Sequence, residues 1–258
     1  MKPCVLTIAG SDSGGNAGIQ ADLRAFHAYG LHGCTVITSI TAQNPLKVIA
    51  AEPVSPALVE AQLRAVLGTY NIKALKTGML GSAQLVEVVA NVLKDYPKIP
   101  IVCDPVMVAT SGSVLSDDAT ISALISRLFP LSALITPNIP EWEIIKERAK
   151  LGTVPSYLGT VPTLVKGGHS EGGDSIDELI CSCESYYFSA PRIVNPVSTH
   201  GTGCSLSAAI AAELALGREL RSAIAGAKKF VTDAIAGSYK VGEGEGVGVL
   251  GFAPRGKV

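Results

Sequence analysis

Along the chain, short runs of β-branched and other apolar residues alternate with longer segments whose apolar positions follow a helical pattern. The short runs predict buried strands, and the longer segments predict amphipathic helices. The expected strands are Cys4–Ala9, Gly33–Thr41, Ala74–Lys76, Ile101–Cys103, Ala133–Thr136 and Thr163–Val165. The expected helices are Gly18–Tyr29, Pro56–Gly68, Ala83–Lys94, Asp117–Phe129, Pro140–Lys150, Gly203–Leu216 and Leu220–Ser238.

This alternation predicts an α/β fold with a mostly parallel sheet and helices on both of its faces. Ile176–Cys181 and Tyr186–Phe188 interrupt the rhythm, and they predict a small antiparallel hairpin, so that the sheet is mixed. No shift in composition, Pro/Ser-rich linker or internal repeat divides the chain. We therefore expect a single domain over residues 1–258.

Composition narrows the class of protein. The chain has 258 residues, of which 47% are hydrophobic and 17% charged, and its net charge is −1, which argues against disorder and against a nucleic-acid surface. The apolar run Cys4–Ala9 is too short for a signal sequence or a membrane span. The six cysteines lack the spacing of a zinc site or a disulfide framework, which fits a cytoplasmic location.

Polar residues follow several of the expected strands, at the sheet edge where α/β proteins bind ligands. Asp104 is either a capping group or a carboxylate of a metal or phosphate site, and Lys166 either holds a phosphate or is solvated. Asn138 and Glu141 follow another strand, where a glutamate is commonly only a partner of the helix dipole. Together with an anion-binding turn, these residues are the components of Mg²⁺-dependent phosphoryl transfer without a Walker loop.

Two glycine-rich segments are candidates for that turn. Gly10–Gly18 joins a strand to a helix, but it lacks the Gly-Lys-Ser/Thr of a Walker loop and is weak evidence alone. Gly201-Thr202-Gly203-Cys204 opens an apolar helix, where free N–H groups and the helix dipole suit a phosphoryl group. Cys204 is then expected to have a lowered pKa. A structural glycine turn with a buried cysteine remains an equal alternative at this point.

Eight segments, in this order, are similar to one known family. They are TIAGSDSGGNAGIQADLRAF (7–26), GCTVITSITAQNP (33–45), KTGML (76–80), DPVM (104–107), LITPNIPE (134–141), VKGGH (165–169), FSAPRI (188–193) and STHGTGCSLSAAIAAELALG (198–217). On these residues the chain resembles the hydroxymethylpyrimidine/phosphomethylpyrimidine kinases of thiamine biosynthesis, in the ribokinase-like superfamily.

The resemblance implies a three-layer α/β/α sandwich, an ATP- and Mg²⁺-dependent kinase and a homodimer. Its substrates would be 4-amino-5-hydroxymethyl-2-methylpyrimidine and then the resulting monophosphate. The implied site residues are Gln43, Gly10, Asp12, Met79 and Asp22 for the pyrimidine, Gly201, Thr202, Gly203 and Cys204 for catalysis, Lys166 and Asn138 for ATP, and Asp104 and Glu141 for Mg²⁺.

Two other functions stay open on the sequence. A pyridoxal/pyridoxine kinase would use the same scaffold, because both substrates are six-membered heteroaromatic rings with a hydroxymethyl arm. A non-catalytic binding protein is the other alternative, although such a protein would not need the turn, Lys166 and Asp104 together. The chain also departs from the family over residues 146–162, where poor helix formers indicate a missing or shortened helix.

Overall fold

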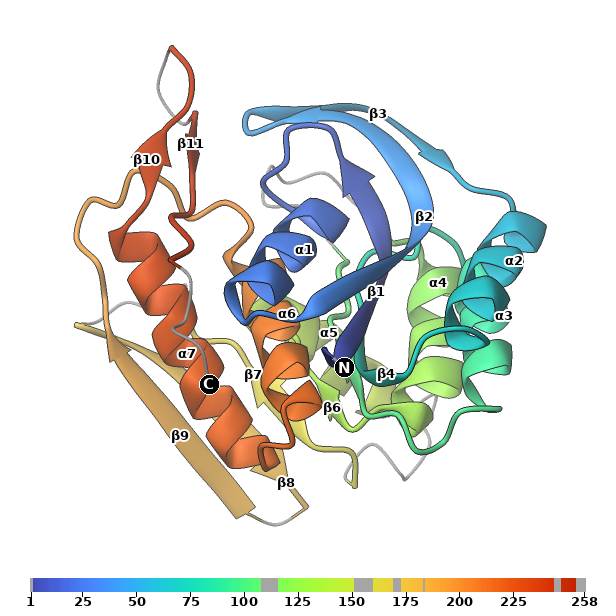
Figure 1. The fold of residues 1–258 in the computed structure, drawn as a ribbon. Coiled ribbons are helices and arrows are strands. Elements are labelled where there is room, and N and C mark those ends of the chain that lie inside the picture. The colour runs from blue at the N-terminus through green and yellow to red at the C-terminus, as the bar shows by residue number, and fades with distance from the viewer. Residues whose placement is uncertain are drawn as a thin grey trace.

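A computed structural model describes residues 2–107, 116–150, 160–168, 173–182, 184–243 and 247–253, without the side chains of 149 and 150. Within these residues, nine strands form one sheet in the order β3-β2-β1-β4-β5-β6-β7-β8-β9 (Figure 1). They are β1 (Cys4–Asp12), β2 (His32–Asn44), β3 (Lys47–Pro53), β4 (Ile72–Thr77), β5 (Ile101–Cys103), β6 (Leu134–Ile135), β7 (Thr163–Val165), β8 (Asp174–Cys181) and β9 (Glu184–Pro191). The six central strands, in the order β2, β1, β4, β5, β6 and β7, pair in parallel. β3, β8 and β9 pair antiparallel to their neighbours.

Two separate hydrophobic cores lie on opposite faces of the sheet. Consecutive residues of β1 divide between them, with Leu6 in one core and Val5 in the other, because side chains alternate along a strand. The first core packs against α2 (Pro56–Leu67), α3 (Ala83–Leu93), α4 (Asp118–Ala123) and α5 (Ile139–Lys150). The second packs against α1 (Gly18–Ala28), α6 (Thr202–Ala215) and α7 (Leu220–Ala236). The expected three-layer α/β/α sandwich is confirmed.

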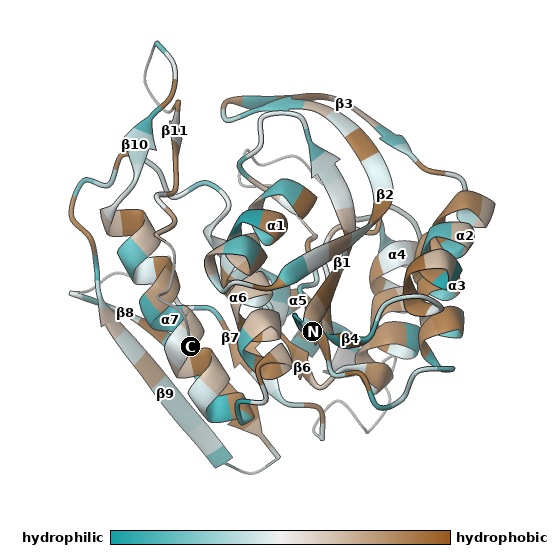
Figure 2. Cartoon of the chain, viewed as in Figure 1, coloured by the Kyte–Doolittle hydropathy of each residue, from teal (hydrophilic) through white to brown (hydrophobic). Residues whose placement is uncertain are grey.

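Hydropathy follows this layering. Hydrophobic residues gather on the central strands and on the helix faces turned toward them, and polar residues lie outside (Figure 2). Local chemistry sets the helix starts: Ser55 accepts a hydrogen bond from the Leu58 N–H, and Pro56 occupies the first turn of α2. Among the described residues, no helix combines the length and the apolarity that a bilayer crossing requires.

The structure differs from the expected elements in three places. β2 continues to Asn44 and pairs with β3, which the pattern did not predict because every β3 residue is exposed or only partly buried. The helix expected over Asp117–Phe129 changes after α4 into a π-helical turn, Leu124–Leu128, and a 3-10 turn, Phe129–Leu131. A short hairpin, β10 (Tyr239–Lys240) with β11 (Gly248–Val249), was also not expected.

The hairpin predicted at Ile176–Cys181 and Tyr186–Phe188 is present as β8 and β9, each longer than expected. Most of the segment 146–162, where a missing helix was expected, lies outside the described residues. α5 itself runs to Lys150.

Candidate active site

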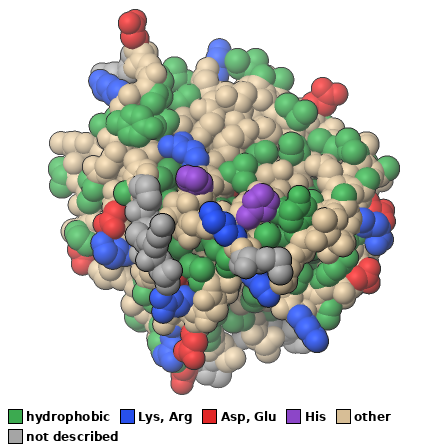
Figure 3. Space-filling model, in the orientation of Figure 1, with side chains coloured by type: hydrophobic (Ala, Val, Ile, Leu, Met, Phe, Trp, Pro, Cys, Tyr) green, Lys and Arg blue, Asp and Glu red, His purple; other side chains and the backbone are tan. Residues whose placement is uncertain are grey.

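A cavity of about 680 Å³ opens where the parallel strands end. Residues at or just after the carboxyl ends of six neighbouring strands line it, in agreement with the rule for α/β sheets. They are Asp12 for β1, Gln43 for β2, Met79 for β4, Asp104 for β5, Asn138 for β6 and Lys166 for β7. On the face drawn in Figure 3, the acidic and basic side chains of the described residues are interspersed and form no broad basic surface.

The loop after β1 is held by one carboxylate. Asp12 is 3% exposed, and its oxygens accept hydrogen bonds from the N–H groups of Gly14 at 2.8 Å, Asn16 at 2.9 Å and Ala17 at 2.8 Å. These three hydrogen bonds fix the loop ahead of α1. Asp12 lines the cavity as expected, but its observed contacts organise the loop.

That loop touches the segment Gly201–Cys204, which we call the transfer turn. Gly201 has φ +82°, and a Cβ atom there would lie 1.8 Å from the Asn16 carbonyl oxygen. Gly18 has φ +56°, and a Cβ atom there would lie 2.3 Å from the Gly10 carbonyl oxygen. Glycine is therefore required at Gly201 for the two loops to meet, and at Gly18 for the loop after β1 to fold back on Gly10.

The transfer turn is the N-terminus of α6. Thr202 N–H donates to the Thr199 carbonyl at 3.3 Å, so this amide is already engaged. Helix geometry leaves the amides of Gly203 and Cys204 without an intrahelical acceptor. Lys166 adds positive charge at the same place, since its Nζ lies 3.5 Å from the Cβ position of Gly203. The turn can therefore hold an anionic group.

Asp104 and Lys166 form an ion pair in the wall of the cavity, with 2.7 Å between Oδ1 and Nζ. Asp104 also accepts hydrogen bonds from the hydroxyls of Thr136 and Ser207, each at 3.2 Å. Burial favours the neutral carboxyl, but Lys166 and Lys76 outweigh it and hold the pKa of Asp104 below its ordinary value. Burial likewise opposes the charge on Lys166, but Asp104 and Glu141 raise its pKa. Both groups are therefore charged.

Asn138 and Glu141 form a capping box at the start of α5. The Asn138 side chain accepts from the Glu141 N–H at 2.9 Å, and Glu141 Oε2 accepts from the Asn138 N–H at 2.8 Å. Glu141 Oε1 accepts from the Met107 N–H at 3.2 Å. Burial is the main cause of a raised pKa at Glu141, with Lys166 opposing it and Asp104 adding to it. The helix-start role considered for Glu141 is thus present in the structure.

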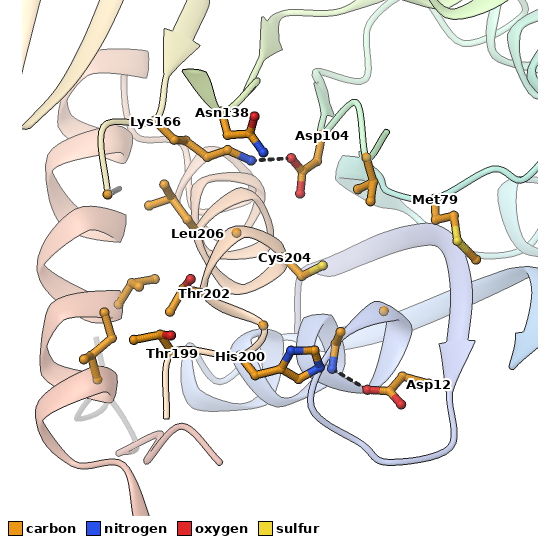
Figure 4. Close-up of a pocket in the computed structure, with 18 of the residues that line it drawn as sticks. Asp12, Met79, Asp104, Asn138, Lys166, Thr199, His200, Thr202, Cys204 and Leu206 are labelled. Atoms are coloured by element: carbon orange, nitrogen blue, oxygen red, sulfur yellow. Dashed lines mark hydrogen bonds and ion pairs between the residues drawn. The ribbon is translucent and has the colours of Figure 1, made fainter. Parts of the chain in front are cut away.

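Figure 4 shows how these groups lie relative to the transfer turn. The Cys204 side chain projects between the Asp104–Lys166 pair on one side and His200 with Asp12 on the other, and Met79 lies beyond its sulfur. Thr199, Thr202 and Leu206 lie toward the opposite end. Met79 thus lies on one side of Cys204, and Thr199, Thr202 and Leu206 lie on the other.

Comparison with known proteins identifies the family of this chain. Residues 12–248 match the model of a family described as phosphomethylpyrimidine kinase. The chain belongs to the phosphomethylpyrimidine kinase family. The resemblance inferred from the sequence is confirmed, and the chain is accordingly a kinase.

Relatives in this family cover nearly the whole chain. The hydroxymethylpyrimidine/phosphomethylpyrimidine kinase of Haemophilus influenzae is 42% identical over 254 residues, which are 94% of each chain. Thiamine biosynthesis bifunctional protein ThiED of Geobacter sulfurreducens is 45% identical over 94% of this chain. The matched part is 51% of that protein, so the chain spans about half the length of this relative.

A solved structure outside the pyrimidine kinases is also similar. The ADP complex of Bacillus subtilis pyridoxal kinase has a TM-score of 0.84 and 31% sequence identity, and the match covers 98% of both chains. The ribokinase-like scaffold therefore serves kinases of two related heteroaromatic rings.

The expected lowering of the Cys204 pKa is wrong for this kinase. Burial is the largest influence and raises the pKa of the thiol, and the negative charges of Asp22 and Asp104 raise it further. Lys76 and a hydrogen bond from the Gly18 N–H oppose this without reversing it. The helix N-terminus was considered alone in the sequence, whereas desolvation and two carboxylates outweigh it in the fold.

Asp22 was expected to face the substrate, and the structure places it elsewhere. It is fully buried and is absent from the cavity wall among the described residues. Its carboxylate accepts hydrogen bonds from Thr7 at 2.6 Å and from Lys76 Nζ at 2.9 and 3.0 Å. Lys76 contributes to the cavity wall and was not recognised from the sequence. Its sequence signal is a lysine inside the apolar strand β4.

A second ion pair in the cavity was also missed. Lys228 Nζ lies 2.8 Å from Asp177 Oδ2 and 2.9 Å from the Ser175 hydroxyl. Asp177 Oδ1 accepts from the Gly167 N–H at 2.9 Å, so the pair holds the turn that follows Lys166. Apolar residues line the cavity beside it: Ile193, Pro196, Leu206, Val231 and Ile235.

His200 carries a buried ring nitrogen in the wall of the cavity. Nε2 is buried and has no hydrogen-bond partner among the described residues, and the side chain lines the cavity. Burial lowers the pKa of His200, although Asp12 opposes this, so the ring is neutral at physiological pH. His169 of the predicted Lys-Gly-Gly-His segment lies outside the described residues.

Proposed function

We propose that this chain transfers the γ-phosphoryl group of ATP to the hydroxymethyl group of 4-amino-5-hydroxymethyl-2-methylpyrimidine, and then to the monophosphate, giving the diphosphate. The observation that carries this proposal is the continuous cavity that joins Gln43 and Met79 to the Lys228–Asp177 pair through the transfer turn. An acceptor ring and a nucleotide can both bind there with the turn between them.

The pyrimidine binds at the end formed by Gln43, Gly10 and Met79. A Cβ atom at Gly10 would lie 2.6 Å from Met79 Cε, so glycine lets the methionine side chain form this wall. Thr38 fixes Met79 from behind by donating to its carbonyl oxygen at 2.7 Å. The Gln43 amide carries both donors and an acceptor, which match the edge of an aminopyrimidine. Asp12 supports this end by holding its loop.

ATP binds along the other half of the cavity. Lys166 and Asn138 contact its phosphates, with the Lys166 ammonium already oriented by Asp104 at 2.7 Å. The apolar residues beside Lys228 offer a surface for the base. The amides of Gly203 and Cys204 then receive the phosphoryl group as charge develops on its oxygens.

Cys204 takes the acceptor proton in its thiolate form. The acceptor O–H gives its proton to the sulfur, its oxygen forms the new bond to the γ-phosphorus, and the bond from that phosphorus to the β-phosphate oxygen breaks, which releases ADP. Because burial raises the pKa of the thiol, the thiolate is a minor species at neutral pH.

Mg²⁺ fits the carboxylates present if water lies between them. Mg²⁺ commonly binds through one or two carboxylates together with phosphate oxygens and water. Asp104 and Glu141 provide two hard oxygen ligands, but their oxygens already accept hydrogen bonds from protein donors. The described residues contain no cluster of three or more candidate ligands, which agrees with a largely hydrated ion. The ion would neutralise phosphate charge during transfer.

A turnover assay tests the proposed function. The purified full chain, with ATP and Mg²⁺, is offered the hydroxymethylpyrimidine, its monophosphate and pyridoxal in separate reactions, and ADP release is measured. We expect turnover of both pyrimidines. Turnover of neither would overturn the proposal, and turnover of the alcohol alone would restrict it to the first phosphorylation.

A pyridoxal kinase is the second candidate, favoured by the similarity to the Bacillus subtilis enzyme. Gln43 and Met79 are the residues that bear on the choice between the rings. Turnover of pyridoxal alone in the same assay would establish this alternative, because it would show that the cavity accepts the pyridine ring and rejects the pyrimidine.

We further propose that the chain forms a homodimer. The β2–β3 ribbon exposes large apolar side chains, with Ile40 61%, Leu46 62% and Ile49 65% exposed, and burial against a second copy would remove them from water. Light scattering after size exclusion would give twice the chain mass. A monomer at all concentrations tested would overturn this proposal.

A cytoplasmic location is also proposed. The described cysteines Cys4, Cys34, Cys103, Cys181 and Cys204 are free thiols, which a reducing compartment maintains. Fractionation of cells that express the tagged chain tests this location.

A further inference from the structure

A fully buried ion pair lies where β4 packs against α6, the helix that begins with the transfer turn. Lys76 Nζ is 2.9 Å from Asp22 Oδ2, and both side chains are 0% exposed. Thr7 completes the cluster by donating to the same oxygen at 2.6 Å. The three residues come from β4, α1 and β1, so the fold brings together groups that lie far apart in the sequence.

The surrounding backbone leaves room for the Lys76 ammonium. A Cβ atom at Gly78 would lie only 2.8 Å from Lys76 Nζ, so glycine leaves room for the charged end of the side chain. The same turn continues into Met79, which lines the pyrimidine end. Lys76 therefore lies near the end of β4, paired with Asp22 and in the cavity wall.

Stability alone does not explain this pair. Two charges removed from water carry a large desolvation cost, and well-packed apolar residues of similar volume commonly give an equally stable or more stable core. The second core, on the same face of the sheet, is made of such residues. A charged pair next to a catalytic turn therefore calls for a role in the reaction.

We propose that Lys76 and Asp22 are positioning residues for the proton acceptor of the transfer step: Lys76 supplies a fixed positive charge in the cavity wall that Cys204 also lines, and Asp22 orients that charge and limits its effect. This inference rests on the role proposed above for Cys204. The other charged groups that act on this site are Asp104, after β5, and Lys166, after β7.

The proposal predicts opposite effects for the two single variants. Lys76→Met removes the positive charge, and Asp22, whose pKa burial already raises, then takes up a proton. Asp104 remains, so the thiol loses its proton at higher pH. Asp22→Asn leaves the ammonium less opposed, so the thiol loses its proton at lower pH. Each change shifts the titration of Cys204 by about 1 pH unit, the size expected for one nearby charge.

Alkylation of Cys204 by iodoacetamide measures this titration directly. The rate is followed against pH on the full chain in EDTA without nucleotide, and peptide mass spectrometry counts only Cys204, with Cys204→Ser as the blank. Lys229→Met is the matched control, because its pair with Asp233 at 2.8 Å is exposed. We expect the control to leave the titration unchanged.

The double variant Lys76→Met/Asp22→Asn guards against misfolding of either single variant. It removes both charges from the core, and its thiol should titrate above that of the unmodified chain, since Lys76 influences Cys204 more than Asp22 does. Equal titration in the double variant and the unmodified chain would overturn the proposal. Shifts of the two single variants in the same direction would also overturn it.

Kinetic measurements distinguish a failure of the Lys76–Asp22 proposal from a failure of the proposed function. The pH profile of kcat should move in the same direction as the thiol titration in each variant, with little change in the KM for the pyrimidine. If the titration of Cys204 shifts but the pH profile of kcat does not, the pair does not act on the transfer step, and the proposal is overturned. Turnover of the pyrimidines in that case would still uphold the kinase activity.

Discussion

At the scale of single residues, the site depends on how neighbouring groups change one another's protonation states. Asp104 remains ionised although it is 2% exposed, because Lys166 and two hydroxyls stabilise its charge. Cys204 lies in the same region, yet burial raises the pKa of its thiol. Identity and position in the sequence therefore do not fix the protonation state of a group, and the packing around it does.

The raised pKa of Cys204 predicts the pH dependence of activity. If the thiolate takes the proton, kcat rises with pH until the pH reaches the thiol pKa, because the thiolate fraction rises about tenfold per unit below it. Cys204→Ala should lower kcat about 10²-fold and flatten this profile. Initial rates of ADP release across the alkaline range would measure both effects.

Cys181→Ala is the control for that experiment. Cys181 lies in β8, away from the cavity wall, and its replacement should keep the pH profile. If Cys204→Ala instead keeps a rate near that of the unmodified chain, the role of Cys204 is structural.

Several site residues could be predicted from the sequence because each follows a strand whose apolar pattern is clear. Asp104, Asn138 and Lys166 were expected at one rim and do line one cavity. The Lys76–Asp22 pair could not be found in this way, since its members are 54 positions apart and only the fold joins them. Desolvation, which reverses the expectation for Cys204, is likewise a property of the folded chain.

At the scale of elements, helix starts provide much of the site. The Asn138–Glu141 capping box begins α5 and also places both side chains in the cavity wall. The start of α6 forms the transfer turn, and Asp12 fixes the loop before α1. Three helix N-termini thus converge on one cavity, where their partial positive charges favour an anionic ligand.

Asn138 allows the structural role of a helix start to be separated from its binding role. Asn138→Ala removes the cap and should lower the free energy of unfolding by about 1 kcal/mol, as measured by urea denaturation. Asn138→Asp keeps an oxygen that caps, so it should retain stability while the added charge raises the KM for ATP. Ser82→Ala is the matched control, because Ser82 caps α3 away from the cavity wall.

We expect Ser82→Ala to lower stability by about as much as Asn138→Ala without changing the KM for ATP. An unchanged KM in Asn138→Asp would contradict the proposed contact with ATP.

Elements with a buried face were predictable, and elements without one were not. The starts of α1 and α2, and all of β5 and β7, agree with the pattern because their side chains pack on one or both faces. β3 has no buried residue, so hydrophobic periodicity could not reveal it. The π-helical turn Leu124–Leu128 keeps apolar residues at helical spacing, and the pattern does not distinguish it from an α-helix.

At the scale of the whole molecule, one cavity is built from nearly the full length of the chain. Its wall includes Ala9 near the N-terminus and Ile235 in α7. The two cores share the strands between them, so neither helical layer is complete without the same sheet. This arrangement fits the single domain expected over residues 1–258.

A single domain predicts one cooperative unfolding transition. Calorimetry should give equal calorimetric and van't Hoff enthalpies under conditions where the chain is a monomer. A non-hydrolysable ATP analogue at about 100 times its Kd should stabilise the whole transition by about 2.7 kcal/mol. Two transitions, of which only one responds to the nucleotide, would contradict a single domain.

The β2–β3 ribbon has a consequence for how this enzyme can change over evolutionary time. Gln43, proposed to contact the ring, lies on this ribbon at the edge of the sheet, while the groups proposed to bind phosphate lie at the centre. Most of β3 is exposed in the single chain, so its substitutions remove little packing within the fold. Ring preference can therefore drift by mutation of the ribbon while the phosphoryl-transfer machinery stays intact.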